Sequence, residues 1–223
     1  MPLLNGETRK KLVGWIESKQ AQPHARGYQG EVFLYRENGE RYIVKAASGR
    51  GIARALRARM LENEFAAYQK LEDFAASPRC YGFLDGKYLV LEYIEGISVR
   101  RGEINDPVRF FEELFAAIVE LHRRGIAHAD LKRKDNLLVV EGNRPCVLDF
   151  GTAIIRKDSF APLNRLLFKF ACQTDLNAWI KLKYRKRMAE ISPDDRLHYH
   201  RTFVESALRE GKRFYKWIKR KLL

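Results

Sequence analysis

The sequence has few cysteines and no long apolar run, and each lack argues against a class of protein. Its 3 cysteines lie far apart and form no Cys-X-X-Cys pair, which argues against a disulfide framework and a structural zinc site. No stretch approaches the roughly 20 apolar residues of a membrane-spanning helix. The N-terminal segment MPLLNGETRKKLVGWIESK carries charge before an apolar core forms, so we expect no signal peptide. These features favour reduced thiols and a cytoplasmic protein.

The chain has fewer acidic than basic residues, so negative charge is in deficit. The chain has 42 Lys and Arg against 28 Asp and Glu, a net charge of +14. The excess is greatest in residues 165–223, which hold 16 Lys and Arg against 6 Asp and Glu. Such a field attracts polyanions, namely nucleic acid, anionic lipid headgroups, phosphorylated glycans or nucleotides. Charge alone does not choose among these partners.

The apolar pattern predicts strands in the first part of the chain and helices in the second. Strand-like runs meet at Asn38-Gly39 and Asp85-Gly86, which are typical hairpin turns, and a third hairpin lies around Glu141-Gly142-Asn143. Helical periodicity is found in residues 3–18, 53–74, 107–124 and the basic region after about residue 160.

Segregation of strands from helices is typical of an α+β fold. The 223 residues, 46% of them hydrophobic, suffice for two small lobes that share a core. We expect the boundary near Glu95-Gly96, with an N-terminal lobe of residues 1–95 and a C-terminal lobe of residues 96–223.

Two small residues stand in residues 25–32 (ARGYQGEV), just before a predicted strand. Gly27 and Gly30 would let backbone N–H groups approach an anion closely. An ordinary hairpin turn explains the same pattern. No Gly-Lys-Ser/Thr follows, so the segment is not a Walker loop.

Lys45 lies within an apolar strand, where an inward lysine would be costly unless it were paired. The alternative is that Lys45 points outward to water. Glu64 favours the inward orientation, because it falls on the same helical stripe as Leu61, Tyr68 and Leu71. The sequence therefore predicts an ion pair between Lys45 and Glu64.

The greatest density of reactive side chains is in residues 128–138 and 148–152, on either side of the third hairpin. Asn136 and Asp149 offer hard oxygen ligands of the kind that Mg²⁺ prefers. Asp130 could accept the proton of an attacking hydroxyl, and Lys132 could neutralise charge on a transferred phosphoryl group. The alternative, that these are ordinary loop carboxylates, does not explain why they occur together.

In chain order, residues 25–152 resemble the protein-kinase-like superfamily: a glycine loop, a strand lysine, a helix glutamate, a His-Ala-Asp-Leu-Lys segment and an Asp-Phe-Gly triplet. The resemblance implies a two-lobed fold with ATP and Mg²⁺ held between the lobes. It assigns cofactor binding to Gly27, Gly30, Val32, Lys45, Glu64, Glu92 and Tyr93, catalysis to Asp130 and Lys132, and metal binding to Asn136 and Asp149. Glu92 and Tyr93 would form the hinge that meets adenine, and Phe150 would pack beneath the helix.

The chain departs from the kinase pattern at several positions. Ala25 replaces the first loop glycine, and Ala129 replaces the usual arginine, so control by activation-loop phosphorylation is not expected. One extra residue separates Asp130 from Asn136, which makes Asp135 a competitor for the role of metal ligand.

The chain after Thr152 also departs from the pattern. No Ala-Pro-Glu motif follows, so the usual substrate-binding half is missing or replaced. Asp175, which we place at the opening of a helix, could brace the backbone of the catalytic loop.

Three functions follow from the resemblance. A chain this small is similar to the bacterial lipopolysaccharide core kinases for heptose or Kdo, and to the RIO-type atypical protein kinases. We prefer a kinase that phosphorylates a sugar hydroxyl of lipopolysaccharide core or another lipid-linked glycan. A serine/threonine protein kinase is the alternative, and a pseudokinase that binds without transfer is the third.

Two basic segments, 181–187 and 211–223, interleave cations with aromatic residues. The second, drawn as a helix, is amphipathic and suits an anionic membrane surface at the inner face of the inner membrane. Packing on the C-terminal lobe explains it equally well, and nucleic acid is not the expected partner. The arginines of residues 50–59 would either dock an anionic substrate or form a solvated helix face.

Overall fold

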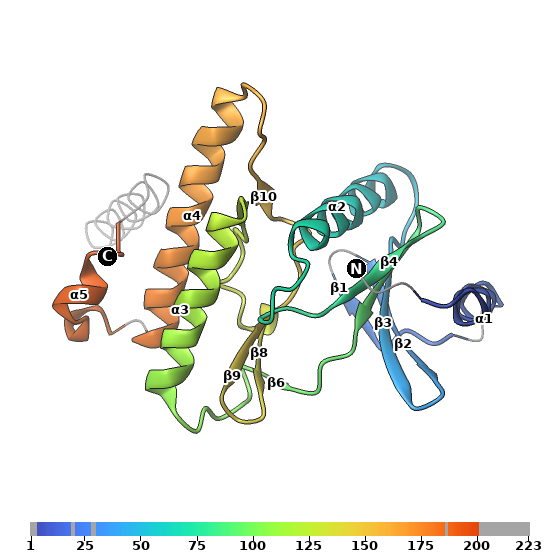
Figure 1. Ribbon diagram of the computed structural model, residues 1–223, viewed down its shortest axis with the longest axis horizontal. Helices are drawn as coiled ribbons and strands as arrows, with labels where there is room; N and C mark the ends of the chain where they lie inside the picture. Colours follow the sequence, from blue (N-terminus) through green and yellow to red (C-terminus); the bar gives the residue numbers. More distant parts are fainter. Residues whose placement is uncertain (1–3, 19–20, 28–29, 186, 201–223) are drawn as a thin grey trace, which may run out of the picture.

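The computed structural model describes residues 4–18, 21–27, 30–185 and 187–200 (Figure 1). The helices are α1 (Gly6–Glu17), α2 (Gly51–Lys70), α3 (Pro107–Arg123), α4 (Pro162–Lys183) and α5 (Pro193–Arg196), with 3-10 turns at Lys134–Asn136 and Met188–Glu190. The strands are β1 (Ala25–Gly27), β2 (Gly30–Glu37), β3 (Glu40–Ala46), β4 (Cys80–Leu84), β5 (Tyr88–Glu92), β6 (Ile97–Ser98), β7 (Ile126–Ala127), β8 (Leu137–Val140), β9 (Arg144–Val147) and β10 (Ile154–Ile155).

The N-terminal lobe is a five-stranded antiparallel sheet between two helices. The strand order is β1-β2-β3-β5-β4. Side chains alternate across each strand, so Val90 packs with Leu12 of α1, whereas Leu89 and Leu91 pack on the other face with Leu61 of α2. Both faces of this sheet are therefore covered by helices.

The predicted hairpins are present in this sheet. Asn38 and Gly39 have φ of 51° and 81°, which is the type I′ geometry that an Asn-Gly pair favours. Asp85 and Gly86 also have positive φ and connect β4 to β5. These turns thus favour the observed registers of the β2–β3 and β4–β5 pairs.

The C-terminal lobe is mainly helical, with α3 and α4 running alongside each other (Figure 1). Asp106 caps α3 through a hydrogen bond from the Arg109 N–H, and Pro107 occupies its first turn. The apolar stripe of α3 is buried as predicted. Its members belong to a core that also contains Leu61 and Leu89, so the two lobes share apolar packing.

The third predicted hairpin is formed by β8 and β9, which join β6 in a three-stranded sheet. A two-stranded pairing of β7 with β10 lies beside α4. In the described part of the chain, none of the helices is both long and apolar enough to span a bilayer.

The α+β, two-lobed fold agrees with the sequence prediction. Two helix boundaries differ from it: the first helix begins at Gly6, where Asn5 caps it, and α2 ends at Lys70, before a turn. The prediction that Asp175 opens a helix was wrong, because α4 begins at Pro162 and Asp175 lies in its middle. The lobe boundary near Glu95-Gly96 stays a prediction, and the segment 211–223 lies outside the described residues.

Candidate active site

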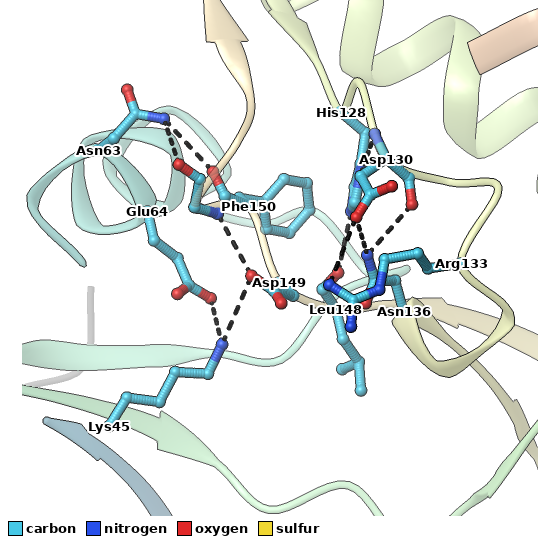
Figure 2. Close-up of polar contacts among 11 residues, drawn as sticks. Lys45, Asn63, Glu64, His128, Asp130, Arg133, Asn136, Leu148, Asp149 and Phe150 are labelled. Carbon is cyan, nitrogen blue, oxygen red and sulfur yellow. Dashed lines mark hydrogen bonds and ion pairs between the residues drawn. The ribbon is translucent and has the colours of Figure 1, made fainter. Parts of the chain in front are cut away.

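The predicted pair of Lys45 and Glu64 is present where the two lobes meet (Figure 2). Lys45 Nζ donates to Glu64 Oε1 at 2.7 Å and lies 4.0 Å from Asp149 Oδ1. The Glu64 side chain is fully buried and that of Lys45 is 15% exposed. The alternative that Lys45 points outward is therefore wrong: Val44 faces α1, and Lys45 faces α2 on the opposite side of the sheet.

The charges of this pair are set by burial and by each other. Burial disfavours the charged form of Lys45, but the charges of Glu64 and Asp149 and the hydrogen bond outweigh it, so the pKa of Lys45 is raised. Burial likewise disfavours the charged form of Glu64, which raises the pKa of this carboxyl group. The charge of Lys45 offsets that rise only in part. Lys45 is thus held as a cation beside Asp149, which suits it to bind an anionic group.

Phe150 fixes the position of Asp149 by packing beneath α2, as the resemblance implied. It is fully buried, and its ring lies 5.3 Å from that of Tyr68 and 5.1 Å from that of His128. These aromatic contacts connect α2 to the loop of residues 128–136, which the resemblance assigns to catalysis, through the residue that follows Asp149. Asp149 itself has a φ of 68°, a strained conformation that this packing helps to maintain.

Asn63 holds the same segment from the side of α2 (Figure 2). Its Nδ2 donates to the carbonyl oxygens of Phe150, Gly151 and Ala153, at 3.4, 3.2 and 2.9 Å. Our sequence analysis missed Asn63, because a neutral amide on a helix carries no periodic or charge signal. The position immediately before Glu64 was the only available clue.

Asp130 and Asn136 lie together on the loop of residues 128–136, between β7 and β8. Asn136 Nδ2 donates to the Asp130 carbonyl oxygen at 3.1 Å and lies 3.5 Å from its carboxylate oxygen Oδ2. Asn136 is buried, whereas Asp135 is exposed and turns toward Ser98 and Arg100. The geometry therefore favours Asn136 over Asp135 as the residue that faces the site.

Asp175 braces this loop, as predicted, although from the middle of α4. Its carboxylate accepts hydrogen bonds from the backbone N–H groups of His128 and Ala129, at 2.7 and 2.8 Å. Ala129 has a φ of 66°, an unfavourable conformation for a non-glycine residue. The buried carboxylate compensates for that strain by satisfying two adjacent donors.

The tautomer of His128 follows from its partners. Its Nε2 lies 2.9 Å from the Leu148 carbonyl oxygen, which can only accept, so Nε2 carries the proton. Nδ1 then accepts from the Asp130 N–H at 3.3 Å. His128 thus connects Leu148, which precedes Asp149, to the backbone of Asp130.

The glycine loop is described in part. Gly27 pairs with Gly30 at the end of the β1–β2 hairpin, while residues 28–29 lie outside the described part of the chain. Gly30 has a φ of 144°, and a β-carbon there would clash with the carbonyl oxygen of Ala46. Val32 pairs with Lys45 in the sheet. Gly30 is therefore needed for the close approach of β2 to β3.

The two hinge residues lie at the end of β5 and beyond it. The Glu92 side chain turns toward Arg79, whose N–H it accepts at 3.0 Å. The Tyr93 N–H donates to the Arg41 carbonyl at 3.2 Å, so this donor is already used and only its carbonyl is available for an adenine contact. Their assignment to adenine binding stays a prediction.

Two cations follow Asp130 on the same loop. Lys132 is exposed, and its role in neutralising phosphoryl charge stays a prediction. Arg133, which the sequence analysis did not single out, has its Nη1 3.7 Å from Asp130 Oδ2. Arg133 stands between two lysines, so the sequence offered no reason to single it out as a partner of Asp130.

These residues fit a magnesium nucleotide by their chemistry. Figure 2 shows Asp149 between the Lys45–Glu64 pair and the Asp130–Asn136 group. Because the Asn136 amide nitrogen donates to Asp130, its Oδ1 remains as a neutral oxygen that could act as a metal ligand together with the Asp149 carboxylate. One carboxylate and one amide oxygen, next to a lysine that is held charged, match what Mg²⁺ and phosphate oxygens require.

Comparison with known proteins agrees with this geometry. No family model matches the chain. Among curated proteins, it is 31% identical over 164 residues to the serine/threonine-protein kinase grp of Drosophila melanogaster, covering 66% of this chain and 30% of the relative. It is 29% identical over 146 residues to CBL-interacting protein kinase 25 of Oryza sativa subsp. japonica, covering 58% and 28%. It is 28% identical over 106 residues to the probable serine/threonine-protein kinase fnkB of Dictyostelium discoideum, covering 43% and 19%.

The chain thus matches less than a third of the length of these relatives. The relatives are protein kinases, which supports the resemblance to the protein-kinase-like superfamily and a phosphotransferase activity. They do not bear on the finer resemblance to lipopolysaccharide core kinases or RIO-type kinases. Among the acceptors considered above, they favour a protein serine or threonine over a sugar.

Proposed function

We propose that the chain is an ATP- and Mg²⁺-dependent kinase that transfers the γ-phosphate to a serine or threonine hydroxyl of a protein. The observation that carries this proposal is the convergence of Lys45, Asp149 and Asp130 from separate stretches of the chain (Figure 2). The names of the similar proteins support the protein acceptor.

In this function, Lys45 binds phosphate oxygens and Glu64 keeps its ammonium group in place. Asn136 and Asp149 hold the metal, and the backbone of Gly27 and Gly30 covers the phosphates. The bound magnesium nucleotide supplies the phosphoryl group and offsets its negative charge.

Asp130 orients the acceptor hydroxyl and accepts its proton. The loop holds its backbone, since the Asp130 N–H donates to His128 and its carbonyl accepts from Asn136. Positioned bases of this kind contribute about 10²- to 10⁴-fold to rate. Lys132, in the same loop, reduces the charge on the group in transfer.

A sugar hydroxyl of a lipid-linked glycan is the second candidate acceptor. The observation in its favour is the short connection after Gly151: it passes through β10 and enters α4 at Pro162. That length leaves little chain for the extended substrate-binding segment of larger protein kinases. A cytoplasmic location is part of the proposal in both cases.

The test is incubation of the purified chain with γ-labelled ATP, Mg²⁺ and either a protein extract or lipopolysaccharide core. Label on protein serine or threonine supports the proposal, and label on the glycan supports the second candidate. ATP binding without transfer to either pool would support the pseudokinase. Asp130→Ala should abolish transfer and spare ATP binding, whereas the exposed control Asp158→Ala should change neither; continued turnover in Asp130→Ala would contradict the mechanism.

A further inference from the structure

The first turns of α4 carry a row of exposed apolar side chains. In Figure 1 the beginning of α4 projects past the end of α3. The row consists of Leu163, Leu166, Leu167 and Phe170, with exposed fractions between 42% and 68%, and is preceded by Phe160, which is 89% exposed. At about 100° per residue, the four helical members fall within an arc of about 100°. They form one continuous surface, which we call the α4 stripe.

The opposite face of the same turns packs against the body of the protein. Phe168 and Ala171 are buried in a small cluster with Ala127 of β7. The Arg156 guanidinium covers the ring of Phe168 at 5.6 Å. The stripe is therefore held on a fixed helix, and its exposure is not caused by a loosely attached segment.

The charge around the stripe identifies its partner. No acidic residue occurs between Asp158 and Asp175, whereas Lys169 lies about 60° around the helix from the edge of the stripe. Arg156 and Lys157 precede it. A second copy of the chain docked on the stripe would bring like charges together, which is unfavourable, whereas an anionic partner would neutralise them.

A second exposed apolar and basic surface lies at the beginning of α2. Ile52 and Leu56 are 81% and 63% exposed, one turn apart, and Arg50 comes directly before the helix. In Figure 1 both α2 and the first turns of α4 lie along the upper edge of the molecule.

We propose that the α4 stripe docks the protein on an anionic lipid bilayer. The leucine and phenylalanine side chains enter the boundary between headgroups and acyl chains, and Lys169 contacts lipid phosphates. This surface is separate from the basic segment 211–223, which lies outside the described residues. The inference does not depend on phosphotransfer, because it concerns residues that the proposed mechanism does not use.

The experiment is co-sedimentation of the full chain with two kinds of vesicle. One contains phosphatidylcholine alone, and the other contains phosphatidylcholine with phosphatidylglycerol. We expect binding to the anionic vesicles only, with a loss of binding as salt is added. The double substitution Leu166→Asp/Phe170→Asp should lower the partition coefficient by more than roughly tenfold, since two apolar anchors are removed and two negative charges are added.

The matched control is Val108→Asp/Leu197→Asp, which makes the same kind of change at exposed apolar residues outside the stripe. It should sediment like the original chain, and circular dichroism and ATP binding should be unchanged in both variants. Sedimentation of Leu166→Asp/Phe170→Asp at the original level would overturn the proposal, as would failure of the original chain to bind anionic vesicles. A dimer that only the stripe variant loses, without vesicle binding, would instead make the stripe an interface between copies.

Discussion

The carboxylate of Asp175, buried in the middle of α4, accepts hydrogen bonds from two successive backbone N–H groups, those of His128 and Ala129. This contact connects α4 to the loop that carries Asp130. It also stabilises the positive φ of Ala129. The position of the proposed base therefore depends on a residue 45 positions later in the sequence.

We expect Asp175→Asn to lower both stability and transfer. The amide retains one acceptor but places an N–H group against a backbone donor, so one charge-assisted hydrogen bond is lost and one contact becomes repulsive. The free energy of unfolding should fall by about 3 kcal/mol. Urea denaturation and a phosphotransfer assay measure the two effects, and the exposed substitution Asp158→Asn is the control. Unchanged transfer at full stability would show that the contact does not position Asp130.

The Lys45–Glu64 pair gives a prediction that separates stability from function. Lys45→Met leaves a buried carboxylate without its cation, which should destabilise the protein by about 3–5 kcal/mol. Lys45→Met/Glu64→Leu removes the unpaired charge and should recover most of that loss, yet it should not restore nucleotide binding. Denaturation and nucleotide titration distinguish the two. Equal stability of the single and double variants would mean that Glu64 does not depend on Lys45.

Asn63 should affect the proposed metal site without contributing a ligand to it. In Asn63→Ala the carbonyl groups of Phe150, Gly151 and Ala153 lose their shared donor, so the segment that carries Asp149 becomes less constrained. We expect a stability loss of about 1–2 kcal/mol and weaker Mg²⁺-nucleotide binding. Gln69→Ala, at an exposed position of the same helix, should change neither. Normal nucleotide affinity in Asn63→Ala would assign Asn63 a purely structural role.

The sequence predicted those parts of the fold that depend on local chemistry. The turn at Asn38-Gly39 needs positive φ at two positions, and the α3 stripe follows a strict helical period, so both could be read without the structure. The Lys45–Glu64 pair was predictable because a buried lysine and a buried glutamate each need a partner of opposite charge, and each could serve as the partner of the other. Each of these features has its cause within a short stretch or in one simple pairing.

The remaining features depend on tertiary contacts that leave little trace in the sequence. The choice between Asn136 and Asp135 depends on where the 3-10 turn at Lys134–Asn136 ends, and this sets which side chain is buried. Asp175 was predicted to open a helix, whereas it lies in the middle of α4, which begins at Pro162. The apolar pattern around Asp175 does not show where the helix starts. The α4 stripe was not predicted either, because an apolar helical face is usually buried, and only the arrangement of α3 and α4 shows that this one is exposed.

The three cysteines give a prediction about chemical reactivity. Burial raises the pKa of Cys80 to about 11, and the pKa values of Cys146 and Cys172 to about 12. A raised pKa keeps each thiol neutral to higher pH in the folded chain, and the thiolate is the reactive form. At about pH 8, near the pKa of an ordinary thiol, all three should therefore react slowly with iodoacetamide, and each should react readily once the chain is unfolded.

The order of labelling tests the structural cause. Cys172 is only partly buried and should be modified first. Cys80 and Cys146 are buried and should react only when the fold opens. The raised values also fix the sign of the pH dependence: the contribution of the neutral thiols to stability is present at neutral pH and is lost as pH rises toward about 11 to 12. Mass spectrometry of each cysteine against time and pH measures both effects. Rapid modification of Cys80 or Cys146 at about pH 8 in the folded chain would contradict their burial.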